Sequence, residues 1–214
     1  MNFIFIILTF LISAVIARIL IPRILLISLR KKLFDIPDDR KIHKRAIPRL
    51  GGVSFFPTTL FAFCLVYAFR LLDGNSISTL YASYLLPELL LFACGMTLLY
   101  LTGIADDLVG VRYRQKFAIQ IFCACLFPLS GLWINDLYGL FGIHELSAYV
   151  GIPFTVLTVV FITNAINLID GIDGLASGLS SVALLVFTFL FISKGLWSYA
   201  MLSAGTFGVL VPFF

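Results

Sequence analysis

Seven long apolar runs constrain this chain more than any other feature of its sequence. Each is close to the ~20 residues that an α-helix needs to cross the hydrocarbon core of a bilayer. Hydrophobic residues make up 61% of the chain and charged residues 12%, which leaves too few polar side chains to cover a soluble domain of 214 residues. The runs cover residues 3–22, 52–70, 85–103, 116–133, 150–168, 175–193 and 199–214.

These runs predict an all-α, polytopic transmembrane bundle of about seven spans. Phe, Leu and Ile dominate them without the alternating polar period of a membrane β-barrel. No basic residue precedes the first run, so we expect an uncleaved first span and not a signal peptide. Residues 1–214 are expected to form a single integral membrane domain with its N-terminus outside. The four cysteines lie inside apolar runs, which indicates packing and neither a disulfide framework nor a zinc site.

Basic residues gather between alternate runs, and their placement sets the orientation of the bundle. Connections rich in lysine and arginine stay on the cytoplasmic side of a membrane. The first and third connections are therefore predicted to face the cytoplasm, and so is the fifth, because successive connections alternate between the two sides of the membrane. The basic residues are Arg30, Lys31, Lys32, Arg40, Lys41, Lys44, Arg45 and Arg49 in the first connection, and Arg112, Arg114 and Lys116 in the third.

The first connection combines its charges with a histidine, two prolines and a glycine pair. A plain polybasic anchor for anionic lipid needs only the charges, and it remains an alternative. A phosphate-rich ligand would use the loop as a set of charge-assisted hydrogen-bond donors. The candidate phosphate-binding residues are Arg40, Lys41, His43 and Arg49.

Two adjacent aspartates, Asp106 and Asp107, follow the third run. One of them could cap the start of the next helix, but a cap does not account for both. Adjacent carboxylates raise each other's affinity for protons unless a cation lies between them, so a hard metal ion or a proton-transfer role is expected. Lys116 and Gln120 stand four residues apart, which puts them on one helical face directed back toward the carboxylates.

A third polar motif separates the fifth run from the sixth. Placing a carboxylate at the bilayer centre costs about 2.5–3.5 kcal/mol, so the aspartates of both motifs are expected at the cheaper cytoplasmic boundary. Oxygen ligands of this kind beside a basic loop suit Mg²⁺ that bridges a diphosphate. The amides and carboxylates of the third motif recur every third residue, at Asn164, Asn167, Asp170 and Asp173.

Together the three motifs resemble those of the polyprenyl-phosphate N-acetylhexosamine-1-phosphate transferases, also classed as glycosyltransferase family 4. The first reads Asp-x-Pro-x-x-Arg-Lys-x-His with Pro-x-x-Gly-Gly, and the second Gly-x-x-Asp-Asp with Lys-x-x-x-Gln. The third reads Asn-x-x-Asn-x-x-Asp-Gly-x-Asp-Gly-Leu, and the match spans residues 35–175. The Arg-Lys-x-His form is more similar to the undecaprenyl-phosphate GlcNAc-1-phosphate transferases than to the phospho-MurNAc-pentapeptide transferases.

The resemblance implies transfer of a sugar 1-phosphate from a UDP-amino sugar to a polyprenyl phosphate such as undecaprenyl phosphate, with release of UMP. The favoured donor is UDP-GlcNAc. It implies Mg²⁺, or Mn²⁺ in its place, as cofactor. It also implies a bacterial-type inner membrane, a site on the cytoplasmic face, and a first step in cell-wall, lipopolysaccharide or teichoic-acid synthesis. No nucleic acid is expected as a partner, and a homodimer is left open.

The same resemblance suggests roles for the residues of the second motif. Asp106 would deprotonate the lipid phosphate, Asp107 would stand beside it at the metal and phosphate centre, and Lys116 would contact phosphate. Direct displacement is favoured over a covalent aspartyl intermediate, because positioning and electrostatics supply most phosphoryl-transfer catalysis.

For the third motif, the resemblance implies that Asn167 holds the metal-bound diphosphate and that Asn164 contacts substrate. Asp170 and Asp173 would line the nucleotide site. The chain looks like a fragment within this family, because it stops at Phe214, where a cytoplasmic loop with a further magnesium-binding aspartate would follow. Activity is therefore expected of the family, and that of these 214 residues alone is left open.

Three other functions remain as alternatives. A membrane aromatic prenyltransferase also uses aspartate pairs with Mg²⁺, but the basic loop argues against it. A cation-coupled transporter would place its polar residues near the bilayer midplane on broken helices, whereas here they collect at one surface. A purely structural membrane subunit would not need so many carboxylates near the bilayer.

Overall fold

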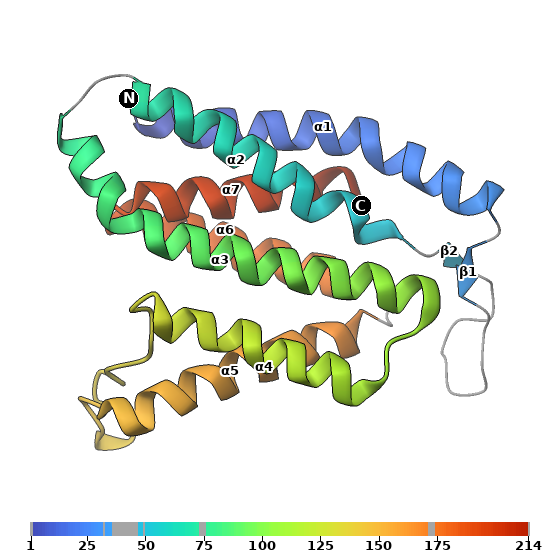
Figure 1. The fold of residues 1–214 in the computed structure, drawn as a ribbon. Coiled ribbons are helices and arrows are strands. Elements are labelled where there is room, and N and C mark those ends of the chain that lie inside the picture. The colour runs from blue at the N-terminus through green and yellow to red at the C-terminus, as the bar shows by residue number, and fades with distance from the viewer. Residues whose placement is uncertain are drawn as a thin grey trace. The chain divides into compact units, whose positions relative to one another are not determined.

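Seven α-helices account for most of the part of the chain that the structure describes. A computed structural model of the protein describes residues 2–31, 33–35, 47–48, 50–72, 76–170 and 174–213. Each of these seven helices coincides with one predicted apolar run, so the all-α fold is confirmed (Figure 1). Their bounds are Asn2–Arg30 (α1), Phe55–Leu72 (α2), Ser76–Val109 (α3), Tyr113–Leu129 (α4), Ala148–Ile169 (α5), Leu175–Ser193 (α6) and Trp197–Leu210 (α7).

Short elements occupy parts of the connections between the helices. Two strands of two residues each, Phe34–Asp35 (β1) and Ile47–Pro48 (β2), pair antiparallel in the first connection. This pairing holds the two ends of the basic loop side by side. The 3₁₀ turns among the described residues are Gly51–Ser54 (η1), Leu140–Gly142 (η2) and Val211–Phe213 (η3).

Among the described residues, five helical segments are long and apolar enough to cross a bilayer. Between 11% and 28% of the most apolar window of each is buried, so most of their side chains are at least partly exposed, as lipid contact requires. The 17 residues of α4 and the 14 of α7 give about 26 and 21 Å of helix, less than the ~30 Å hydrocarbon core. The chain is a multi-pass membrane protein, whereas the count of seven spans and the outward N-terminus stay predictions. The five segments are Asn2–Arg30, Gly51–Leu72, Leu85–Val109, Ala148–Ile169 and Leu175–Ser193.

The chain divides into two compact units. The first comprises residues 1–75 and 169–214, and the second comprises residues 76–168. In the first unit, α7 packs against α1, α2 and α6. A single membrane domain over the whole chain stays a prediction.

A small residue lets α1 and α7 approach closely in the first unit. A Cβ atom on Gly208 would overlap Ser13 Oγ and would lie 2.5 Å from the carbonyl oxygen of Phe10. The Ser13 hydroxyl donates to that same carbonyl at 2.9 Å, so this buried hydroxyl has a hydrogen-bond partner. Beside this contact the rings of Phe10 and Phe207 stack with centroids 5.6 Å apart. Close packing of this kind joins helices in lipid, where burying apolar surface against a neighbour gains little.

In the second unit, α4 packs against α3, and the segment that follows α4 contacts the first half of α5. Phe92 of α3 meets Phe127 of α4 edge to face, with ring centroids 6.2 Å apart. The backbone N–H of Ile134 donates to Thr155 Oγ1 at 2.9 Å. Gly151 makes room for this segment, because a Cβ atom there would lie 2.5 Å from the carbonyl oxygen of Ile134. Helices α4 and α5 run in opposite directions (Figure 1), so the end of α5 lies beside the first half of α4.

Candidate active site

The carboxylate pair lies at the C-terminal end of α3. This helix runs on to Val109, past the predicted end of the third apolar run at residue 103, and so includes Asp106 and Asp107. Gly110, at φ +71°, follows the helix in the left-handed conformation that glycine adopts without strain. Arg112 is the N-cap residue of α4, and it makes no side-chain capping bond. Neither aspartate is therefore the N-cap residue of α4, because both belong to the preceding helix.

Asp106 is held by two donors from the segment that follows it. Lys116 Nζ lies 2.9 Å from Oδ2, and the backbone N–H of Val111 donates to Oδ1 at 2.9 Å. The side chains of the ion pair stay partly exposed, at 27% for the lysine and 31% for the aspartate. The lysine thus points back toward the carboxylates, as its position on α4 predicts.

An amide pair links α4 to α5 one helical turn beyond Lys116. Asn164 Nδ2 donates to Gln120 Oε1 at 2.8 Å and to the carbonyl oxygen of Val160 at 2.8 Å. Gln120 is 5% exposed. The sequence predicts Gln120 on the same face as Lys116 and no function for it, although a glutamine inside an apolar run is a signal for one.

The other predicted residues fall into three places. Asp107 at the end of α3 and Asn167 at the end of α5 are exposed and belong to the second unit, as Asp106 does. Asp170 is exposed directly after α5 and falls in the first unit. The remaining predicted residues lie outside the described part of the chain, and they are Arg40, Lys41, His43, Arg49 and Asp173.

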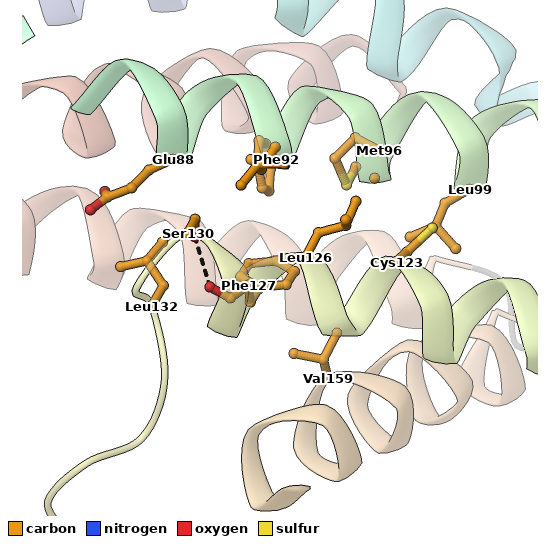
Figure 2. A pocket seen from close by; sticks show the side chains of 12 residues that line it. Glu88, Phe92, Met96, Leu99, Cys123, Leu126, Phe127, Ser130, Leu132 and Val159 are labelled. Atoms are coloured by element: carbon orange, nitrogen blue, oxygen red, sulfur yellow. Dashed lines mark hydrogen bonds between the residues drawn. The ribbon is translucent and has the colours of Figure 1, made fainter. Parts of the chain in front are cut away.

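A pocket of the second unit lies apart from the carboxylates, between α3 and α4 (Figure 2). Its volume is about 360 Å³, open mouth included, and its lining is apolar except for Glu88 and Ser130. The Ser130 hydroxyl donates to the carbonyl of Phe127 at 2.7 Å, the bond dashed in Figure 2. On α3 the lining ends at Leu99, about two turns before Asp106. Nothing in this lining suits a diphosphate, so the pocket is not part of the candidate site.

Residues 89–214 match the model of a family described as glycosyl transferase family 4. This stretch includes the carboxylate pair, Lys116 and the whole third motif. It covers more than half of the chain, and the resemblance that the motifs indicated is confirmed.

Several curated proteins are similar to most of the chain. A probable undecaprenyl-phosphate N-acetylglucosaminyl 1-phosphate transferase of Bacillus subtilis is 30% identical over 191 residues, which cover 89% of this chain and 49% of the relative. A phospho-N-acetylmuramoyl-pentapeptide-transferase of Staphylococcus carnosus is 28% identical, covering 100% of this chain and 65% of the relative. An undecaprenyl-phosphate alpha-N-acetylglucosaminyl 1-phosphate transferase of Yersinia pestis is 29% identical, covering 83% and 46%.

The chain thus spans between about half and two thirds of the length of these relatives. Their names agree with the resemblance and give no support to an aromatic prenyltransferase or a cation-coupled transporter.

Proposed function

This chain belongs to glycosyl transferase family 4, and from that premise we propose that it transfers an N-acetylhexosamine 1-phosphate to a membrane lipid phosphate. The proposed donor is a UDP-amino sugar, with UDP-GlcNAc as the favoured choice. The proposed acceptor is a polyprenyl phosphate such as undecaprenyl phosphate. The names of the relatives support this choice of sugar and lipid. One structural observation supports the chemistry: an aspartate pair, with a lysine bound to its first member, ends a helix of membrane-spanning length.

In the proposed reaction, an oxygen of the lipid phosphate attacks the β-phosphorus of the UDP-sugar. A new phosphorus–oxygen bond joins the lipid phosphate to the sugar phosphate, and the bond between the α- and β-phosphates breaks. The electron pair of that bond leaves with UMP. Such transfers depend on positioning and on charge stabilisation, so no covalent bond to the protein is needed.

Asp106 is the proposed proton acceptor for the lipid phosphate, and Lys116 controls when it can act. Both oxygens of Asp106 are engaged, one by the lysine ammonium and one by the backbone N–H of Val111. An incoming phosphate competes for the ammonium group, because phosphate oxygens are strong charge-assisted acceptors. The lysine side chain is partly exposed and can turn toward that phosphate. Oδ2 of Asp106 is then released as the substrate arrives.

The donor set at this end of the second unit fits Mg²⁺. Among the residues that the structure describes, no three His, Cys, Asp or Glu side chains gather into a metal cage. Mg²⁺ commonly keeps several waters and takes one or two carboxylates together with substrate phosphates, so an open set of hard oxygens suffices. The proposed protein ligands are Asp107 and the amide oxygen of Asn167, with Mn²⁺ as a substitute metal. When bound, the metal would neutralise the diphosphate.

Two further groups are assigned to the substrates on their sequence motifs. Asp170 is exposed after α5, and together with Asp173 it is assigned to the nucleotide. The basic first connection is assigned to phosphate, because its guanidinium and ammonium groups suit phosphate oxygens. Its proposed binding residues are Arg40, Lys41, His43 and Arg49.

The proposed location is a bacterial inner membrane, with the site on the cytoplasmic face. The support is the basic first and third connections, which adjoin the end of α1 and the start of α4. A lipid-linked sugar diphosphate made there is the starting material for polymerising a cell-envelope glycan, so the proposed reaction is the first step of such a pathway.

The proposal is tested in membranes that contain the protein encoded by the whole gene. They are incubated with sugar-labelled UDP-GlcNAc, undecaprenyl phosphate and Mg²⁺, and labelled lipid and UMP are both measured. Asp106→Asn should lower the rate about 10²- to 10⁴-fold, the usual contribution of a general base. Asp136→Asn, the same change in the connection after α4, is the matched control and should retain the wild-type rate. Undiminished transfer in both Asp106→Asn and Asp107→Asn would rule out the proposed site.

A further inference from the structure

The amide pair between α4 and α5 uses its donors on the protein itself. A side-chain amide nitrogen carries two hydrogens. On Asn164, Nδ2 donates to Gln120 Oε1 and to the carbonyl oxygen of Val160, each at 2.8 Å. Both hydrogens are therefore committed, and the amide group that faces α4 has no donor left for a substrate. The predicted contact of Asn164 with substrate stays a prediction, and it would have to use the amide oxygen as an acceptor.

The pair stands next to residues that the proposed chemistry uses. Lys116 precedes Gln120 by one turn on α4, or about 6 Å along the helix. Asn167 follows Asn164 by about 4.5 Å on α5. Because the two helices run in opposite directions, both of these residues lie on the same side of the amide pair, toward the end of α3 (Figure 1).

Burial makes this contact selective for one arrangement of the helices. Gln120 is 5% exposed and Asn164 is half-buried, so little water can replace the bond between them. A rotation or slide of either helix would leave a buried amide without its partner, which is costly away from water. The hydrogen bond thus favours one depth and one rotation of α4 relative to α5.

We propose that Gln120 and Asn164 are positioning residues, which hold Lys116 against Asp106 and Asn167 at the same end of the unit. This inference deepens the proposed function and rests on it for its catalytic readout. Neither residue touches the substrates in this account. Each acts through a neighbour one turn away on its own helix.

The test measures kcat and KM of the transfer reaction for Gln120→Leu, Asn164→Leu and the double variant. Each single change should lower kcat about 10- to 100-fold, the loss expected when a reacting group is misplaced by about 1 Å. The KM for UDP-GlcNAc should stay within about twofold, because uniform binding is not removed. The double variant should be no worse than either single variant, since the two residues form one contact.

Two further variants separate positioning from general damage to the fold. Gln120→Glu keeps an oxygen that accepts from Asn164 Nδ2, so it should restore most of the wild-type kcat. Gln115→Leu makes the same change as Gln120→Leu at an exposed site on α4 and should leave kcat unchanged. A rise in KM for UDP-GlcNAc in Asn164→Leu, at unchanged kcat, would make Asn164 a substrate ligand and overturn the proposal. Additive losses in the double variant would overturn it too.

One readout does not depend on transferase activity. Lys116 can be labelled with an amine-reactive reagent and its modification followed by mass spectrometry. Gln120→Leu should raise the labelling rate at least about threefold, because the lysine is no longer held against Asp106. An unchanged labelling rate contradicts the positioning role. A wild-type protein without transferase activity would instead contradict the proposed function, while the labelling result still decides the role of the pair.

Discussion

Replacing Gly208 by alanine should push α7 away from α1 and destabilise the first unit. The added Cβ would overlap Ser13 Oγ and lie 2.5 Å from the carbonyl oxygen of Phe10. Carbon–oxygen contacts normally lie at about 3.3–3.6 Å, so the backbones must separate by nearly 1 Å. A backbone carbonyl cannot rotate away as a flexible side chain can. Overpacking of this kind costs about 1–3 kcal/mol.

Thermal unfolding of the purified protein in detergent, followed by tryptophan fluorescence, measures this cost. At about 2–4 °C per kcal/mol for a chain of this size, the midpoint should fall by about 2–12 °C. Gly103→Ala is the matched control, because a Cβ at that helical position in α3 meets nothing within 4 Å. Alanine is a better helix former than glycine by about 1 kcal/mol, so the control should hold or raise the midpoint. If Gly208→Ala unfolds at the wild-type temperature, the close approach of α1 and α7 is refuted.

Three further outcomes are expected. Lys116→Met should lower kcat about 10²- to 10³-fold in the transfer assay because a donor to the transferring phosphate is lost, and Lys116→Arg should keep part of the rate. Asp107→Ala should raise the Mg²⁺ concentration that gives half-maximal activity at least about tenfold, and chelation of Mg²⁺ should stop transfer in the wild type. Gly151→Leu should displace the segment at Ile134 from α5 and shift Trp133 fluorescence to longer wavelength, whereas an unshifted spectrum would contradict that packing.

Helix positions followed from the sequence because a membrane span is set by length and apolarity. The same criterion placed the end of α3 too early, because an apolar run ends where charged residues begin. Helix geometry does not stop there, and α3 continues through Asp106 and Asp107 until Gly110 turns the chain at φ +71°. Helices α4 and α7 show the opposite case, because they end at Leu129 and Leu210, before the predicted ends of their apolar runs at residues 133 and 214.

Contacts close in sequence could also be predicted, and distant ones could not. Lys116 was expected to turn toward the carboxylates because its face of α4 follows from the four-residue spacing to Gln120. The bond between Gln120 and Asn164 joins residues 44 positions apart and depends on how α4 and α5 pack. No periodicity in either helix specifies which amide meets the other. The sequence therefore predicts a substrate contact for Asn164 and does not predict its partner on α4.

The most direct test of the proposed function follows the phosphorus atom that is transferred. UDP-GlcNAc carrying radioactive phosphorus in its β-phosphate is incubated with undecaprenyl phosphate, Mg²⁺ and membranes that contain the protein. Attack on the β-phosphorus predicts that the label appears in the lipid fraction, that the released UMP is unlabelled, and that Asp106→Asn slows the appearance of the lipid label about 10²- to 10⁴-fold. If the sugar reaches the lipid while the labelled phosphorus stays in UDP, the enzyme transfers the sugar alone and the account is contradicted.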